Sequence, residues 1–149
     1  MTTVFKIAVV PWVCHTAQHM EIINKEDVGT WNRVWFDHYQ LLGGESKTTG
    51  NKGCIRAAAR GLWILGRIRT SKRPLLTLEV FAVIEQLTKN AAYAVIAADL
   101  LQSGASPRLP ILWPMVQSEF RRLTDQMPAA SEQGEIRMVI GLHQGGVLN

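Results

Sequence analysis

The chain has 149 residues, 47% of them hydrophobic and 19% charged, and a formal net charge of +4 at pH 7. This composition is typical of one globular domain and excludes a disordered chain, and two cysteines are too few for a disulfide scaffold. No run approaches the roughly 20 apolar residues that span a bilayer, and the apolar segment 4–14 lacks a signal-peptide cleavage site. We therefore expect one domain, residues 1–149, in the cytoplasm and without membrane contact.

The first half of the chain predicts helices separated by glycines. Residues 5–13 fit either a buried strand or a helix interrupted at Pro11, and the helical periodicity of later segments favours the helix. A helix is predicted over 27–42 with Asp27 as its N-cap, then a polar loop over 43–52 and a helix over 53–65. The apolar face of that last helix contains Ile55, Ala58, Ala59 and Leu62.

The second half continues in the same way. Thr77 is the expected N-cap of one helix and Asn90 of the next, which favours two helices over a single one between 77 and 103. Pro110 is well placed to begin another helix, whose predicted inward residues are Leu112, Val116, Phe120 and Leu123. A last helix is predicted over 132–144. The fold class predicted is therefore mainly α, with about six helices and an uncertain N-terminal segment.

Two helix ends resemble each other at an offset of 80 residues. Residues 61–68 and 141–148 both contain Gly-Leu, and both have a glycine followed two positions later by an apolar residue. Two interpretations remain open: the same capping chemistry used twice, or two related helical units.

Positive charge is concentrated in one segment of the chain. No acidic residue lies between Glu45 and Glu79, whereas eight of the sixteen Lys and Arg residues do. At helical spacing, Lys52, Arg56, Arg60, Trp63 and Arg67 share one face, opposite the apolar one. We expect this face to be a solvated structural surface, a nucleic-acid interface or a site for an acidic protein. The candidate binding residues are Lys52, Arg56, Arg60, Trp63, Arg67, Arg69, Lys72 and Arg73.

Catalytic and metal motifs are weak. Gly44 and Gly50 have the wrong spacing for a phosphate-binding P-loop, although the helix start at Gly53 remains a candidate anion site. His15 and His19 have metal-ligand spacing but lack a clear third ligand other than His38. We therefore predict no catalytic residue, no metal and no cofactor.

The order of several short motifs resembles a small, uncharacterised bacterial family, a domain of unknown function. The motifs are Lys52-Gly53-Cys54 at a helix start, Gly61-Leu62 and Gly66 at its end, residues 90–101, Leu112-Trp113 and the helix 136–148. The likeness covers residues 28–149 and departs from the pattern at Ile55, where the family has proline. It implies a helical fold and an origin in bacteria or mobile elements, and it implies no activity.

Taken together, these patterns favour a non-enzymatic binding or adaptor protein that uses the basic segment 52–73, with nucleic acid or an acidic protein as partner. The alternative is a small-ligand binder or enzyme with a pocket between helices near Cys54, His38 and Trp63. A third hypothesis is a homodimer in which exposed tryptophans meet.

Overall fold

A computed structural model describes residues 2–149, and its N-terminal segment differs from the predicted helix. Strands β1 (Thr3–Val4) and β2 (Ile7–Ala8) pair in an antiparallel hairpin, and helix α1 (Val9–Ile23) begins directly after it. Pro11 is the third residue of α1, where its missing N–H would have no partner in any case. The expected helix over 5–13 is therefore wrong before Val9. Pro11 lies in the first turn of α1 and does not interrupt the helix.

The rest of the first half follows the predicted helices closely. Asp27 caps helix α2 (Val28–Leu41), because its side chain accepts the Thr30 N–H at 2.9 Å. Hydrogen bonds from the Thr30 main chain and hydroxyl lower the Asp27 pKa. Within the expected polar loop lies the single turn α3 (Lys47–Gly50). Helix α4 (Gly53–Ile64) ends one residue before its predicted end.

The second half contains helices α5 (Val80–Gln86), α6 (Lys89–Gln102), α7 (Leu109–Thr124) and α8 (Glu135–Gln144). Two helices between 77 and 103 are confirmed, but the predicted caps are wrong. Glu79 precedes α5 without a side-chain cap, and Thr88, two residues before Asn90, caps α6 by accepting the Ala91 N–H. Leu112, Val116 and Phe120 are buried, whereas Leu123, predicted to point inward, is exposed.

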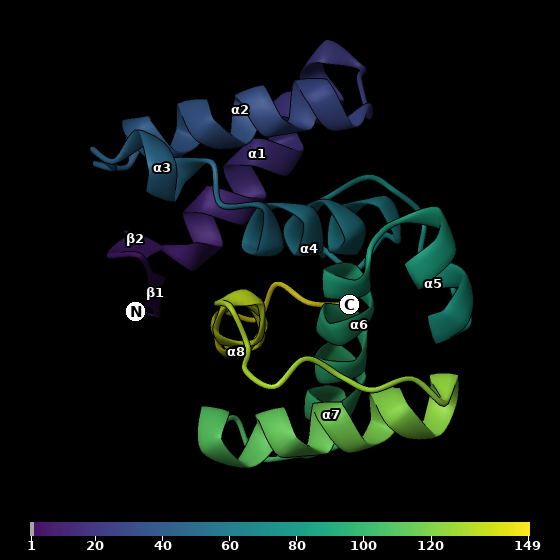
Figure 1. The fold of residues 1–149 in the computed structure, drawn as a ribbon. Helices are drawn as coiled ribbons and strands as arrows, with labels where there is room; N and C mark the ends of the chain where they lie inside the picture. Colours follow the sequence, from purple (N-terminus) through teal and green to yellow (C-terminus); the bar gives the residue numbers. More distant parts are fainter. Residues whose placement is uncertain (1) are drawn as a thin grey trace.

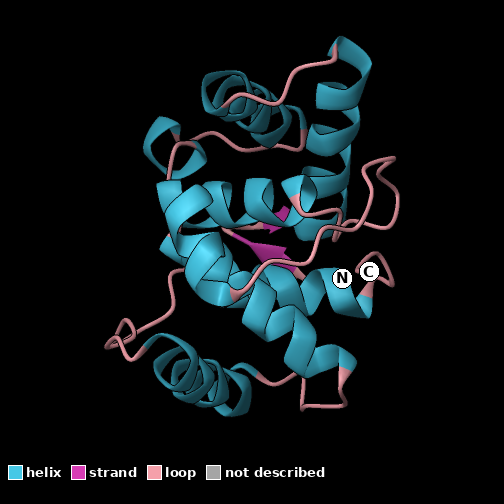
Figure 2. Cartoon of the chain, turned by 90° about the vertical axis from the view of Figure 1, so that its right-hand side faces the viewer, coloured by secondary structure: helices cyan, strands magenta, loops and turns pink. Residues whose placement is uncertain are grey.

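Two helices lie at the centre of the molecule (Figure 1). Helix α4 lies between the α1–α2 pair and α6, and α6 packs against α4, α5, α7 and α8. The two strands form a small hairpin among the helices (Figure 2). The architecture is thus mainly helical, as predicted. No helix in the described part of the chain is long and apolar enough to cross a membrane.

Four tryptophans form a continuous stack through the N-terminal helices. Trp12 of α1 stacks on Trp35 at a centroid distance of 4.1 Å, Trp35 lies 6.0 Å from Trp31, and Trp31 lies 5.3 Å from Trp63 of α4. All four are buried, and Trp113 is only 9% exposed. The expectation that tryptophans are exposed is therefore wrong, and no tryptophan side chain supports the predicted dimer contact.

Three helices of the second half repeat the order and spacing of three helices of the first half, at an offset of about 80 residues. Helices α1, α2 and α4 correspond in order to α6, α7 and α8. The chain leaves α1 through a hydrogen bond from the Lys25 N–H to the Met20 oxygen, at 3.1 Å. It leaves α6 through the equivalent bond from Ala105 to Leu100, at 3.0 Å.

The resemblance of the two glycine-containing helix ends extends to their backbone geometry. Gly66 and Gly146 follow α4 and α8 with φ angles of 72° and 71°, a conformation that side chains other than glycine rarely adopt. Beyond them, Ile68 and Leu148 pair in an antiparallel bridge. The two equivalent ends thus lie side by side, which favours two related units over a repeated capping device.

Candidate functional site

The predicted basic face of α4 is not a free surface. Trp63 is 1% exposed and belongs to the tryptophan stack, and Arg67 is 8% exposed. The Arg67 guanidinium bonds to Asp99 Oδ1 at 2.8 Å and to the main-chain oxygen of Asn149 at 2.8 Å. The expectation that these two residues share an exposed face with Lys52, Arg56 and Arg60 is wrong, because α4 is covered on two sides.

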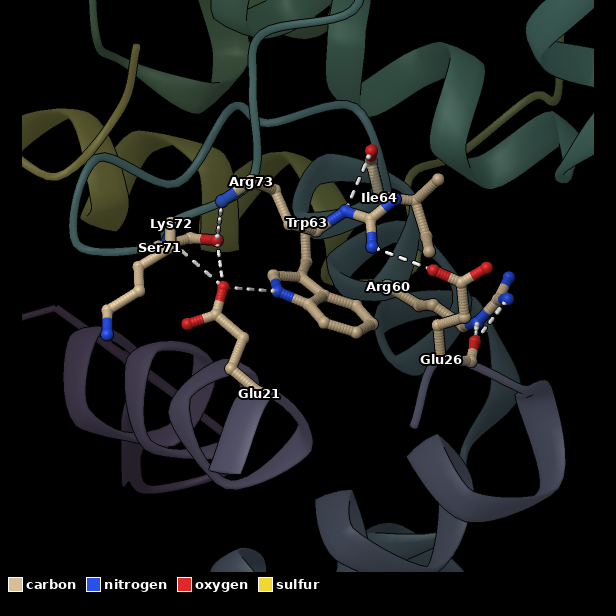
Figure 3. A network of polar contacts seen from close by, with 8 residues as sticks. All are labelled: Glu21, Glu26, Arg60, Trp63, Ile64, Ser71, Lys72 and Arg73. Atoms are coloured by element: carbon tan, nitrogen blue, oxygen red, sulfur yellow. Dashed lines mark hydrogen bonds and ion pairs between the residues drawn. The ribbon is translucent and has the colours of Figure 1, made fainter. Parts of the chain in front are cut away.

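Two further cationic residues of the segment, Arg60 and Arg73, bond to Glu26 in the loop that follows α1 (Figure 3). The Arg60 guanidinium donates two hydrogen bonds to the Glu26 main-chain oxygen, at 3.1 and 2.6 Å. The Arg73 guanidinium pairs with the Glu26 carboxylate at 2.8 Å and lies 5.0 Å from the Trp63 ring. Arg60 thus attaches α4 to the loop that follows α1, and Arg73 attaches the 66–79 connection to the same loop.

A carboxylate of α1 completes this network. Glu21 Oε1 accepts the Ser71 hydroxyl, the Lys72 main-chain N–H at 3.1 Å and the Trp63 indole N–H at 3.3 Å (Figure 3). The Lys72 side chain is exposed, and that of Arg69 bonds to the Leu148 oxygen at 3.3 Å. Of the eight candidate residues, Lys52 and Arg56 lie at the beginning of α4, away from this network.

The beginning of α4 borders a cavity of about 650 Å³, which we call the Cys54 pocket. Its walls are residues 3–6 of the hairpin, residues 52–54, residues 132–134 that lead into α8, and Arg137. The alternative of a pocket near Cys54 thus has a structural counterpart, but His38 and Trp63 lie elsewhere. Sequence reasoning missed Lys6, Glu132 and Arg137, because only folding brings them to the start of α4.

Three cationic side chains border the Cys54 pocket, namely Lys6, Lys52 and Arg137, against the single carboxylate of Glu132. No side chain caps α4, so its positive end is open for an anion. Arg56 adds positive charge there, because its Nη2 lies 3.9 Å from the point where a Cβ of Gly53 would stand. The pocket is therefore electropositive.

The hairpin turn presents two of the pocket residues in an uncommon backbone conformation. Phe5 and Lys6 have φ angles of 52° and 66°, the left-handed region that a two-residue hairpin turn requires and that Asn-Gly normally supplies. Lys52 Nζ lies 4.9 Å from the centre of the Phe5 ring. The turn and the start of α4 are thus in direct contact across the pocket.

The start of α8 is stabilised by its own carboxylates. Glu132 Oε2 accepts the N–H groups of Gly134 and Ile136, at 2.7 and 3.2 Å. Glu135 is buried and accepts the Gln133 N–H at 3.0 Å, and burial raises its pKa. Unlike α4, α8 therefore already has an anionic group at its positive end.

Three histidines lie close together between the two N-terminal helices, namely His15 and His19 of α1 and His38 of α2. His19 Nδ1 lies 3.2 Å from His38 Nε2, and the His15 ring centre lies 6.0 Å from that of His38. Partial burial and the two neighbouring histidines lower the His38 pKa. Within residues 2–149, however, no group of three His, Cys, Asp or Glu side chains is arranged to hold a metal ion.

Comparison of the chain with models of protein families, with curated proteins and with solved structures finds no match.

Proposed function

We propose that this protein binds a small phosphate-bearing molecule in the Cys54 pocket. The observation that carries the proposal is the convergence of Lys6, Lys52 and Arg137, from three separate segments, on a cavity at the uncapped start of α4. Main-chain N–H groups at a helix start and cationic side chains are the groups that proteins commonly use to bind phosphate.

The size of the pocket favours a small molecule over a polymer. Its volume of about 650 Å³ falls in the range of ligand pockets, roughly 300–1,000 Å³. A nucleic-acid interface would instead need several free cations along an open surface, and Arg60, Arg67 and Arg73 are bound to other parts of the chain. Nucleic acid is therefore the less supported partner.

The proposal is tested by titrating 15N-labelled protein with inorganic phosphate, and separately with phenyl phosphate, at about 20 mM salt. We expect the amide signals of residues 53–56 to shift first. Replacing Lys6, Lys52 or Arg137 by Gln should weaken binding about tenfold each, the equivalent of roughly 1.4 kcal/mol. Tighter binding of phenyl phosphate than of phosphate would identify an organic phosphate as the ligand class.

Two controls separate this proposal from general attraction of anions to a basic protein. Lys25→Gln and Arg121→Gln remove exposed cations outside the pocket and should leave phosphate binding unchanged. A single-stranded oligonucleotide is titrated at about 50 and 200 mM salt, because binding to a polyanion falls steeply with salt. No shift at residues 53–56 with phosphate, or tight oligonucleotide binding lost with salt, would refute the proposal.

A further inference from the structure

We infer that Glu132 determines how many anionic groups the Cys54 pocket accepts: its carboxylate fills one of two equivalent anion positions, so that the ligand supplies only one. This inference rests on the proposed function, and it names the ligand class more closely as a molecule with one phosphate group at the bound end. Its basis is the internal repeat.

The pocket is built from the same region of both units. Residues 52–54 border it at the start of α4, and residues 132–134 border it just before α8, at the offset of 80 that relates the two helix ends. At the other ends of these helices, the Arg69 N–H donates to Val147 at 2.7 Å and the Asn149 N–H donates to Arg67 at 2.9 Å. Equivalent residues thus meet both at the pocket and at the bridge.

The start of α8 has an anionic side chain from the protein itself, whereas the start of α4 has none. Lys52 precedes α4, which no side chain caps, whereas the equivalent position before α8 is Glu132. The Glu132 carboxylate accepts two N–H groups at the start of α8, as a bound anion would. The chain therefore shows, at its second helix start, the contact that the ligand is expected to make at the first.

Charge then distinguishes between ligands. A single phosphate group at α4 faces Lys6, Lys52 and Arg137 and lies across the pocket from Glu132. A second phosphate group extending toward α8 would meet the Glu132 carboxylate, and two like charges within a pocket repel each other. The wild-type pocket should for this reason prefer phosphate or a monoester to a diphosphate of similar size.

The test compares the binding of inorganic phosphate and inorganic pyrophosphate by calorimetry in the wild type and in Glu132→Gln. The amide oxygen of glutamine can still accept the N–H groups of α8, but it carries no charge. We expect pyrophosphate to bind about tenfold more tightly in Glu132→Gln and phosphate to change by less than about threefold. Glu119→Gln, which removes a carboxylate paired with Arg122 on α7, is the matched control and should change neither.

The outcomes separate this inference from the proposed function. If the wild type binds neither anion, the proposed function is wrong. If it binds phosphate and Glu132→Gln changes the affinity for both anions by the same factor, or for neither, the role of Glu132 is refuted. Should Glu132→Gln fail to fold, Glu132→Ser supplies an uncharged hydroxyl that can still accept the Gly134 N–H, and it is expected to give the same change in preference.

Discussion

Helices α4 and α6 are in close contact at Gly61, and an alanine there tests how tightly the two halves are packed. A Cβ at residue 61 would lie 2.4 Å from the Cβ of Ala91 and 3.5 Å from its Cα. Carbon atoms pack at about 3.5–4.0 Å, so α6 would have to move by about 1 Å. Because the obstacle is attached to a helix backbone, it cannot rotate away.

The size of the effect follows from two opposing contributions. Overpacking a core costs about 1–3 kcal/mol, and the upper end applies here because backbone must move. Replacing glycine by alanine within a helix by itself raises the free energy of unfolding by about 1 kcal/mol, because alanine has the higher helix propensity. Gly61→Ala should therefore lower the free energy of unfolding by about 2 kcal/mol, which corresponds to roughly 4–8 °C in Tm for a domain of this size.

Urea denaturation of three variants measures this. Gly141, the equivalent of Gly61 in the second unit, is the matched control, because its new Cβ would meet the Thr2 side chain at 3.0 Å. Thr2 lies outside every helix and can shift, so Gly141→Ala should stay within about 1 kcal/mol of the wild type. Gly61→Ala with Ala91→Gly should regain most of the loss. A Gly61→Ala protein as stable as the wild type would refute this account of the packing.

Three further predictions concern buried or titrating groups. Arg67→Ala should lower the free energy of unfolding in urea by about 2–3 kcal/mol, because it removes charged hydrogen bonds to Asp99 and the main chain; a loss below about 0.5 kcal/mol would contradict this. The folded-state pKa of His38 is below its ordinary value of 6.5, so the unfolded chain binds the proton first as pH falls. The free energy of unfolding therefore decreases as the pH falls from 6.5 toward the folded-state pKa. The Tm of His38→Gln should fall less than that of the wild type between pH 7 and 5, and equal decreases in Tm would contradict this prediction. Burial raises the pKa of the Cys14 thiol, so a disulfide reagent should modify Cys54, which borders the pocket, first; a fast phase that persists in Cys54→Ser would be evidence against this order.

Sequence periodicity and capping predicted most of the helices. Asp27 caps α2 as expected, because an N-cap is recognised from neighbouring residues alone. The hairpin escaped prediction, since its strands have two residues each and its turn contains Phe5 and Lys6 instead of glycine or asparagine. Strands this short show no measurable alternation of apolar and polar residues.

The candidate site was predictable only in part. The helix start at Gly53 and the thiol of Cys54 were visible as a local motif, and both border the pocket. The burial of Trp63 was not, because helical spacing identifies faces without showing how many are covered. Helix α4 is enclosed by α6 on one side and by the tryptophans of α1 and α2 on another. Trp63 is therefore buried, although it lies only one helical turn from the accessible Arg60.

The bridge between Ile68 and Leu148 also bears on the order in which the chain folds. Each helix end can form its glycine turn from neighbouring residues, but the bridge joins positions 80 residues apart and closes a long loop. Because closing such a long loop is costly in entropy, we expect the bridge to form late in folding, after the transition state. Leu148→Ala should consequently speed unfolding while leaving the folding rate almost unchanged. On this view, the packing of α4 against α6 joins the two units, and the bridge then fixes their ends together and slows their separation.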